Sequence, residues 1–198
     1  GDALSDDLLS VAGCEAWIAR SARLGKSFEV LRELERLGEK GLIFVEQRSM
    51  QAQMANAMST MFGMERPLII NGDTPGHRRQ DMVDDFQARR RGFDAMILSP
   101  KAAGVGLTIT AANHVIHLSR WWNPAVEDQC NDRVYRIGQE RPVTIHVPMA
   151  VHPALGDKTF DVTLDRLLDG KRRMSRNLLM PPVSDSDLDL VFSTALAA

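Results

Sequence analysis

The sequence has few cysteines, no long apolar run and little net charge. Cys14 and Cys130 are the only cysteines among 198 residues, so we expect neither a disulfide framework nor a cysteine-only metal site, and a reducing compartment, the cytoplasm, fits. No apolar run approaches the roughly 18 residues of a membrane span, and the first residues do not begin a signal peptide. We therefore expect no membrane partner. Because the chain starts with Gly and has no initiator Met, we expect it to be part of a longer protein.

An excess of positive charge is also absent. The chain carries 24 Lys and Arg residues against 26 Asp and Glu residues, a formal net charge of −2. This balance argues against a basic coat for nucleic acid but leaves room for a basic strip. Metal-ligand spacing is missing among the histidines, and His114 and His117 would lie on opposite faces of a strand, so we expect no metal site. With 44% hydrophobic and 25% charged residues, the composition indicates a globular domain with a real core.

Short apolar runs alternate with longer segments of helical periodicity. Five runs are too short for a helix and are bounded by Gly, Pro, Asn or charged residues. They cover residues 42–45, 67–70, 95–98, 114–118 and 143–147. Helices are predicted over residues 26–37, 50–62, 77–87, 125–137 and 159–179. Strands and helices that alternate at these lengths predict an α/β fold, in which helices cover both faces of a parallel sheet.

The chain is expected to divide into four parts. Residues 1–25 form a helical lead-in, residues 26–150 form the α/β lobe, residues 151–182 form a loop and one long helix, and residues 183–198 form an acidic tail. The long helix has an apolar face and a basic far end. The tail carries three aspartates and no positive residue, and it is either disordered or a short docked helix.

Three loops that follow predicted strands carry candidate ligand contacts. Residues 99–108 are rich in small residues, which let a backbone approach phosphate or sugar at the carboxyl end of a strand; a plain strand-to-helix turn is the alternative. Thr74 is able either to bond a nucleic-acid phosphate or to cap the helix that follows. Of Trp121 and Trp122, one is expected to be packed and the other to contact sugar or a partner surface.

Two further patterns have a bland interpretation beside a functional one. The basic clusters at residues 89–91 and 171–173 are either solvated faces or salt-sensitive contacts to phosphates. Gly25-Lys26-Ser27 looks like the end of a phosphate-binding P-loop, but Arg20 stands where that pattern needs Gly. No apolar strand run precedes it, and no acidic magnesium-binding motif accompanies it. The chain is therefore not expected to bind and hydrolyse a nucleotide by itself.

Residues 129–139 are the most informative segment of the chain. On a helix, Gln129, Arg133 and Arg136 fall at i, i+4 and i+7 and share one face. Two arginines one turn apart suit a polyphosphate presented from outside this chain, because guanidinium groups stay charged and bind phosphate oxygens bidentately. The alternative is a solvated helix face on which Asp132 and Arg136 form an i,i+4 ion pair.

The order of these segments resembles the second RecA-like lobe of the Swi/Snf-type family, within the superfamily-two helicase-like ATPases. Residues 41–47 look like the family's motif four, and residues 71–75 are similar to the segment that follows it. Residues 98–112 look like motif five. Residues 129–139 are similar to motif six, and Trp122-Asn123-Pro124 precedes them as in that family.

The resemblance covers most of the chain, from about residue 26 to residue 182. The stretch over residues 111–142 looks especially like prokaryotic members. The sequence departs from the family's common residues at several positions, among them Thr108, where Asn is common, and Tyr135, where His is common. Both arginines of motif six are retained.

The resemblance implies that two lobes clamp ATP between them. The N-terminal RecA-like lobe, which this chain lacks, would hold the P-loop and the magnesium-binding carboxylates, and so most of the contacts to ATP with Mg²⁺. This lobe would offer Arg133 and Arg136 as arginine fingers to the γ-phosphate, with Gln129 as a positioning group. Such fingers contribute roughly 10³–10⁵ in rate. The residues expected near the nucleotide are Gly104, Gly106 and Asp132.

The resemblance also implies a path for DNA. Thr74, Lys101, Gln47 and Trp122 would track one strand of a duplex. Closure of the lobes on ATP, and opening after hydrolysis, would step the protein along double-stranded DNA without unwinding it. The implied partners are double-stranded DNA, the N-terminal lobe of the same full-length chain and, as an open alternative, other proteins of a complex. The isolated chain is expected to be nearly inactive.

Other functions stay open on the sequence alone. One is the corresponding lobe of a strand-separating helicase from the same superfamily. Another is a degenerate, non-catalytic lobe that acts as a DNA or protein interaction module, although Arg133 and Arg136 count against it. A flavodoxin-like binder of a small ligand lacks a hydroxyl- or phosphate-binding loop after the first predicted strand.

Overall fold

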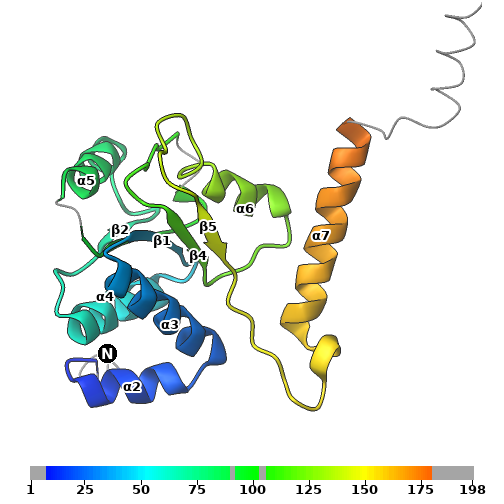
Figure 1. Cartoon of the computed structure of the whole chain (residues 1–198), viewed down its shortest axis with the longest axis horizontal. Helices are drawn as coiled ribbons and strands as arrows, with labels where there is room; N and C mark the ends of the chain where they lie inside the picture. Colours follow the sequence, from blue (N-terminus) through cyan, green and yellow to red (C-terminus); the bar gives the residue numbers. More distant parts are fainter. Residues whose placement is uncertain (1–7, 90–91, 103–105, 180–198) are drawn as a thin grey trace, which may run out of the picture.

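Five parallel strands form the centre of the molecule. The computed structural model describes residues 8–89, 92–102 and 106–179, with the backbone alone for residues 177–179. The strands are β1 Lys40–Phe44, β2 Leu68–Ile70, β3 Asp94–Leu98, β4 His114–His117 and β5 Thr144–His146. They lie in the order β2-β3-β1-β4-β5, and every neighbouring pair is parallel. Helices cover the sheet (Figure 1), so the predicted α/β fold is confirmed.

Among the described residues, five helices follow the order of the sequence pattern, and α2 lies in the predicted helical lead-in. They are α2 Val11–Ala19, α3 Ala22–Leu37, α4 Arg48–Phe62, α5 Gly76–Ala88, α6 Pro124–Asn131 and α7 Phe160–Leu179. Ser21 caps the start of α3 by accepting a hydrogen bond from the Leu24 amide, and Gly38 ends that helix at φ +64°. None of the helices in the described part of the chain has the length and apolar character needed to cross a membrane. The predicted acidic tail at residues 183–198 lies outside the described residues.

Each central strand packs against a different set of helices on its two faces. Ile43 of β1 belongs to a core that includes side chains of α2, α3 and α4. Leu42 and Phe44 of the same strand face a second core, with side chains of α5, α6 and the segment at residues 107–112. Because both faces are covered, the strand has no polar alternation and reads as a continuous apolar run.

One helix is shorter than predicted. The 3.6-residue pattern over residues 125–137 predicted one helix, but α6 ends at Asn131 and residues 132–138 form turns. The main-chain oxygen of Arg133, which would accept an intrahelical bond, accepts instead from the Ile109 amide at 2.8 Å. The prediction that Gln129, Arg133 and Arg136 share a helix face is therefore wrong, because a tertiary hydrogen bond replaces the helix.

The longest helix stands apart from the sheet. Figure 1 shows α7 beside α6, beyond the edge strand β5. Leu164 and Leu168 are buried on the side that meets the lobe. A short 3₁₀ turn, Gly156–Lys158, precedes the helix. The long C-terminal helix predicted from the sequence is confirmed, with bounds within a residue of the prediction.

Candidate functional site

The four predicted DNA contacts lie at one edge of the sheet. Thr74 follows β2, Lys101 follows β3, Gln47 follows β1 and Trp122 follows β4. Because all strands are parallel and these four are consecutive in the sheet, their loops meet in a row at the carboxyl edge. Neighbouring strands are about 4.8 Å apart, so three intervals cover about 14 Å. We call these four residues the edge strip.

Three residues of the edge strip are accessible. Lys101 is exposed, and its Nζ lies 3.3 Å from the Glu46 carboxylate and 5.3 Å from the centre of the Trp121 ring. Gln47 is exposed at the start of α4, where its side chain makes no capping hydrogen bond. Trp122 is 60% exposed and meets Phe160 of α7 edge to face, at 6.0 Å between ring centres. Two polar side chains and one aromatic side chain are therefore accessible along this edge.

The fourth residue of the edge strip is occupied locally. The Thr74 hydroxyl accepts a hydrogen bond from the Asn71 amide at 3.1 Å and lies 3.4 Å from the Ile69 carbonyl. Helix α5 has Pro75 at its N-cap position and no side-chain cap. The capping alternative for Thr74 is therefore wrong, because the hydroxyl closes its own turn.

The first arginine of motif six is buried against its own lobe. Arg133 is 6% exposed. Its Nε donates to the Gln129 carbonyl at 3.1 Å, and its Nη1 donates to the Leu107 carbonyl at 3.4 Å. Burial, followed by the positive charge of Arg136, lowers the pKa of this guanidinium, although an arginine stays charged at such a shift. In this structure Arg133 joins two segments of its own chain.

The second arginine points outward. The side chain of Arg136 is exposed. Its Nε donates to the main-chain oxygen of Asp132 at 3.1 Å, and its Nη1 donates to the Thr108 hydroxyl at 3.0 Å. The alternative of an Asp132–Arg136 ion pair is wrong, because the contact is to the carbonyl. Among the described residues, both motif-six arginines therefore hydrogen-bond neutral oxygens only.

Residues 132–139, which follow α6, are called the arginine segment. They lie beside residues 107–112, which belong to the connection from β3 to β4. The Gln139 amide nitrogen donates to the carbonyls of Thr110 at 3.2 Å, Ala112 at 2.7 Å and Val134 at 3.4 Å. The Gln139 side chain thus connects the end of the arginine segment to its middle and to the connection between β3 and β4. The sequence pattern indicated no such role for Gln139, because two of its three partners are main-chain atoms 29 and 27 residues away.

The remaining predicted nucleotide contacts are only partly described. Gly106 is exposed at φ +54°, a left-handed conformation that strains other residues. Gly104 lies outside the described residues. Asp132 is exposed and ends α6 through its amide, which donates to the Asp128 carbonyl. Gln129 is exposed on α6, and its carbonyl accepts from Arg133.

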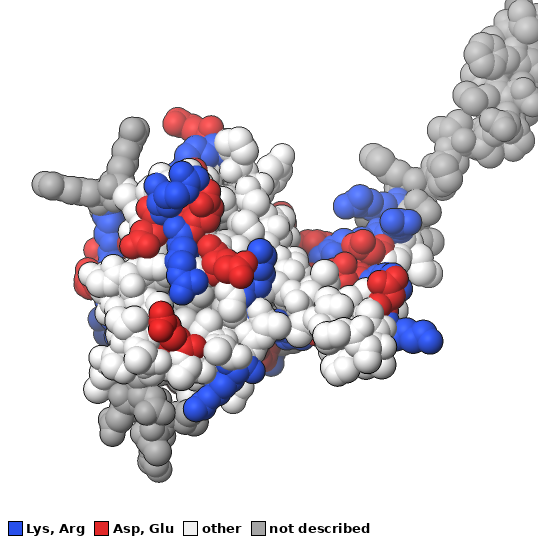
Figure 2. Space-filling model, turned by 60° about the horizontal axis from the view of Figure 1, so that its bottom comes forward, with Lys and Arg blue, Asp and Glu red and all other residues white. Residues whose placement is uncertain are grey.

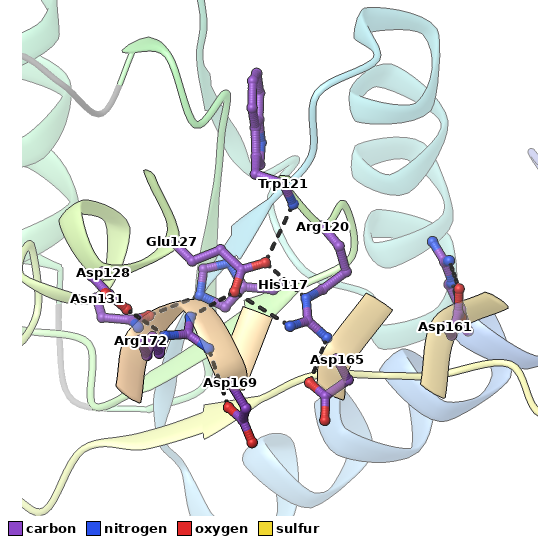
Figure 3. Close-up of polar contacts among 11 residues, drawn as sticks. His117, Arg120, Trp121, Glu127, Asp128, Asn131, Asp161, Asp165, Asp169 and Arg172 are labelled. Carbon is purple, nitrogen blue, oxygen red and sulfur yellow. Dashed lines mark hydrogen bonds and ion pairs between the residues drawn. The ribbon is translucent and has the colours of Figure 1, made fainter. Parts of the chain in front are cut away.

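A cluster of buried charges joins α6 to α7 (Figure 3). Glu127, in the first turn of α6, accepts from Arg120 Nε at 2.7 Å and from Arg172 Nη2 at 2.9 Å. Arg120 also reaches Asp165 of α7 at 3.0 Å, and Arg172 reaches Asp128 at 3.2 Å. The side chains of Arg120 and Glu127 are 4% and 2% exposed. We call these five residues the ion cluster.

The charge of Glu127 is maintained by its neighbours. Burial alone would raise the pKa of this carboxyl, but the hydrogen bond and charge of Arg120, with those of Arg172, outweigh burial and leave the pKa below its ordinary value. Helix α6 adds to this effect, because its N-terminal end carries partial positive charge. Glu127 is therefore a stable carboxylate in a buried place.

Helix α7 has a charged face whose side chains bond other parts of the lobe. Asp161, Asp165, Asp169 and Arg172 recur at helical spacing. The first of them pairs with Arg23 of α3 and accepts from the Ala150 amide at 2.7 Å. In the predicted basic cluster at residues 171–173, Arg172 bonds carboxylates and Lys171 donates to the Trp122 carbonyl at 2.8 Å. Neither is only a solvated charge.

The basic cluster at residues 89–91 is described only at its first member. Arg89 pairs with Asp94 at 3.2 Å and with Asp85 at 3.3 Å, and the other two residues lie outside the described part. On the face shown in Figure 2, basic and acidic side chains are interspersed. This mixture agrees with the small net charge and with a strip of contacts rather than a basic coat.

Comparisons with known proteins agree with this geometry. The family model for the helicase conserved C-terminal domain matches residues 26–138. The chain belongs to this family. It is 40% identical to the Zorya protein ZorD of Escherichia coli over 183 aligned residues. The alignment covers 88% of this chain and 17% of ZorD. It is 35% identical over 189 residues to the putative ATP-dependent helicase/translocase YwqA of Bacillus subtilis, with 93% and 20% covered.

Among solved structures, this helicase C-terminal domain is similar to the Sulfolobus solfataricus SWI2/SNF2 ATPase core in complex with double-stranded DNA. The TM-score is 0.62 and the identity 32%, over 84% of this chain and 31% of that one. The chain is thus the second RecA-like lobe of a Swi2/Snf2-type ATPase, with prokaryotic relatives, as the resemblance indicated. It spans about a fifth of the length of the two curated relatives.

The helicase C-terminal domain contains contacts that its sequence motifs did not single out. Arg120, Glu127 and Gln139 lie between or inside the quoted motifs, and none was predicted to hold the site together. A weak signal was present on α7, where Asp161, Asp165, Asp169 and Arg172 share a helix face. Such a charged face beside buried leucines indicates a buried ionic contact, but the sequence does not identify its partners 40 or more residues away.

Proposed function

We propose that this lobe is the C-terminal half of an ATP-driven motor that moves along double-stranded DNA without separating its strands. The N-terminal RecA-like lobe of the full-length chain would bind ATP with Mg²⁺ through its P-loop and carboxylates. The present lobe would close on that nucleotide and bring Arg136 to the γ-phosphate. Support comes from the family, from the DNA complex of a relative and from the geometry around Arg136.

The observation that carries the proposal is the set of hydrogen-bond partners of the Arg136 guanidinium. Its guanidinium is exposed and hydrogen-bonds a carbonyl and a hydroxyl, not a carboxylate. These oxygens fix the direction of the side chain but leave its charge uncompensated. A guanidinium in that state favours an incoming phosphate, and water exclusion on lobe closure would strengthen the attraction. Thr108 takes part in this arrangement although the family commonly has Asn there.

Arg133 would act on the same phosphate only after a rearrangement. In its present position it donates to two carbonyls and is buried. We propose that it holds the arginine segment while the lobes are apart, and that it reaches the nucleotide as the second finger when they close. Gln129 and Asp132, exposed on either side of it, would position the nucleotide or its attacking water, with Gly104 and Gly106 nearby.

The edge strip would be the DNA contact. Its length of about 14 Å corresponds to about four nucleotides of one strand at a rise of 3.4 Å each. Lys101 would contribute charge, Gln47 and Thr74 would contribute hydrogen bonds to phosphate or sugar, and Trp122 would contribute contact area. None of these groups reads bases, so binding would be salt-dependent and largely independent of sequence.

The decisive experiment is Arg136→Ala in the full-length protein. DNA-stimulated ATP hydrolysis should fall on the order of 10³-fold because transition-state charge loses its partner. ATP binding, measured with a fluorescent analogue, should stay within about threefold, since the N-terminal lobe would supply most ground-state contacts. Arg166→Ala is the matched control and should keep wild-type turnover. It removes an exposed arginine of α7 that pairs with Asp157 in the preceding 3₁₀ turn. Wild-type turnover in Arg136→Ala would refute the arginine-finger role.

A strand-displacement assay separates the proposal from its nearest rival. The relative YwqA is named as a putative ATP-dependent helicase/translocase, which allows both activities. A translocase should displace a triplex-forming third strand from duplex DNA but leave the duplex paired. Release of a single strand from the duplex would favour the strand-separating helicase. ATP-independent DNA binding without any hydrolysis would favour the non-catalytic interaction module.

A further inference from the structure

We propose that Glu127 is a positioning residue that couples the DNA-facing loop after β4 to the arginine segment and to α7. The inference rests on the proposed function and adds a connection between its two sites. Glu127 would touch neither ATP nor DNA. It would act through Arg120 and Trp121, in the loop after β4, and through Arg172 of α7.

The first step is the number of elements that meet at this one carboxylate. Oε1 accepts from Arg120 Nε at 2.7 Å and from the Trp121 amide at 3.3 Å. Oε2 accepts from Arg172 Nη2 at 2.9 Å and from Arg120 Nη2 at 3.4 Å. The loop after β4, helix α6 and helix α7 therefore share a single buried anion, and Figure 3 shows the donors converging on it.

The second step leads from Glu127 towards DNA. The Trp121 main chain is bonded to Glu127, while the Trp121 ring lies under Lys101 Nζ. Trp122, the next residue, is bound to α7 by Lys171. The Trp121 indole nitrogen is buried and has no hydrogen-bond partner among the described residues. An unpaired buried donor is costly, so a movement of this loop that gave it a partner would be favoured.

The third step leads from Glu127 to the arginine segment. Glu127 and Gln129 are on the same short helix, and α6 passes directly into the turn that holds Arg133. His117, at the end of β4, bonds Asn131 at 2.8 Å and fixes the last residue of α6 to the sheet. A small rotation of α6 about that point would move the Gln129 carbonyl, which is one of the two groups that hold Arg133.

The fourth step explains why the link is ionic. Packing alone between α6 and α7 would be served as well or better by apolar side chains, because buried ion pairs recover little beyond their desolvation cost. A carboxylate shared by two guanidiniums is instead strongly directional. The two arginines also have other carboxylates nearby, since Asp165 lies beside Arg120, and Asp128 and Asp169 lie beside Arg172. The ion cluster can therefore exchange partners while its charges stay paired.

The test uses Glu127→Gln in the full-length protein, with Arg172→Met as a second variant and Arg166→Ala, an exposed position of α7 outside the ion cluster, as the control. The Gln side chain keeps the shape and two hydrogen-bonding atoms but removes the charge. The measured quantity is the ratio of DNA-stimulated to basal ATP turnover, with the KM for ATP and the affinity for a 30-base-pair duplex measured in parallel. Circular dichroism confirms that each variant is folded.

We expect this ratio to fall about tenfold in Glu127→Gln, with KM for ATP and DNA affinity within about threefold of wild type. Arg172→Met should lower the ratio in the same direction. The double variant should be no worse than the more severe single variant, because both act through one carboxylate. Glu127→Asp, which restores the charge, should recover part of the ratio.

Three outcomes would overturn the inference. One is that both basal and DNA-stimulated turnover of Glu127→Gln stay at the wild-type level. Another is an equal loss of basal and stimulated turnover, which indicates a merely structural role. The third is full additivity in the double variant. If wild-type protein shows no DNA stimulation at all, the proposed function fails together with this inference, so the wild-type arm distinguishes the two failures.

Discussion

The ion cluster and the arginine segment hold their arginines in opposite ways. In the ion cluster, Arg120 and Arg172 bond carboxylates, of which Glu127 is buried, Asp165 is half-buried and Asp128 is exposed. In the arginine segment, Arg133 and Arg136 bond carbonyls and one hydroxyl. The same side chain is neutralised in one place and only oriented in the other, although the two places are joined by the eight residues of α6.

This difference separates structural arginines from functional ones. A guanidinium that already has its carboxylate gains little from a further anion, whereas one surrounded by neutral oxygens keeps its full attraction for phosphate. Loss of a cluster arginine should therefore damage stability first, and loss of Arg136 should damage activity first. Stability measurements on this 198-residue chain and turnover in the full-length protein give independent tests of the contrast.

The largest stability effect is expected for Arg120→Met. The substitution removes the cation that Glu127 and Asp165 share and leaves the buried Glu127 with Arg172 alone, which should lower the free energy of unfolding by about 3 kcal/mol. Urea denaturation followed by circular dichroism measures it. Arg136→Met should change the same quantity by no more than about 0.5 kcal/mol, because its side chain is exposed. Equal losses in the two variants would remove the distinction.

A smaller effect is expected for Arg133→Met, which lies between the two classes. Two carbonyls, those of Gln129 and Leu107, lose a donor, but no buried carboxylate is left unpaired. We expect a loss of about 1–2 kcal/mol in the free energy of unfolding, together with a loss of DNA-stimulated turnover in the full-length protein. If Arg133→Met kept both its stability and its turnover, Arg133 would be neither a structural nor a functional arginine.

Acid should weaken the surroundings of the ion cluster. The pKa of His117 lies below 6.5 because burial outweighs its hydrogen bond to Asn131. The unfolded chain therefore takes up that proton first, so stability should be full above about pH 6.5 and decline as pH falls below it. The pKa of Glu127 lies below 4.5, so its contribution is full above about pH 4.5 and is lost as pH falls further.

The pH prediction is checked by urea midpoints between pH 8 and pH 4. His117→Asn should flatten part of the decline between pH 6.5 and pH 5, because Asn does not titrate. The pKa of His146 is also lowered, by burial and then by His114, so some of the decline should persist. An unchanged pH profile in His117→Asn would show that His117 is not a source of the decline.

The smallest effect is expected at the edge strip. In the full-length protein, Lys101→Ala should reduce the slope of log affinity for duplex DNA against log salt by about 0.9, the value for one phosphate contact. Gln47→Ala should weaken binding without changing that slope, because it carries no charge. Fluorescence anisotropy at several salt concentrations measures both. A slope that does not change in Lys101→Ala would exclude a phosphate contact there.

The sheet and most helices were predictable because their signals are local. Leu42, Ile43 and Phe44 are apolar in succession since both faces of β1 are covered, and Gly38 marks the end of α3. The order of the motifs then indicated the family. The residues of the edge strip came from that resemblance, and the parallel strands explain why they lie at one edge of the sheet.

The end of α6 and the ion cluster were not predictable for a common reason. Apolar periodicity continues through Val134 and Ile137, but the Ile109 amide captures the Arg133 carbonyl and stops the helix. In the same way, Glu127 looks like an ordinary first-turn residue until Arg120 and Arg172 surround it. Each of these features depends on a partner at a distance in the sequence that periodicity does not encode.

Both cysteines of the chain are buried, and burial raises the pKa of the Cys130 thiol to about 12. Thiol-directed reagents act on the thiolate, so neither native cysteine should react readily with a maleimide. A single cysteine introduced at exposed Ser175 of α7 could then be labelled selectively in this lobe. With a second dye on the proposed N-terminal lobe, energy transfer in single molecules would then test whether the two lobes open and close.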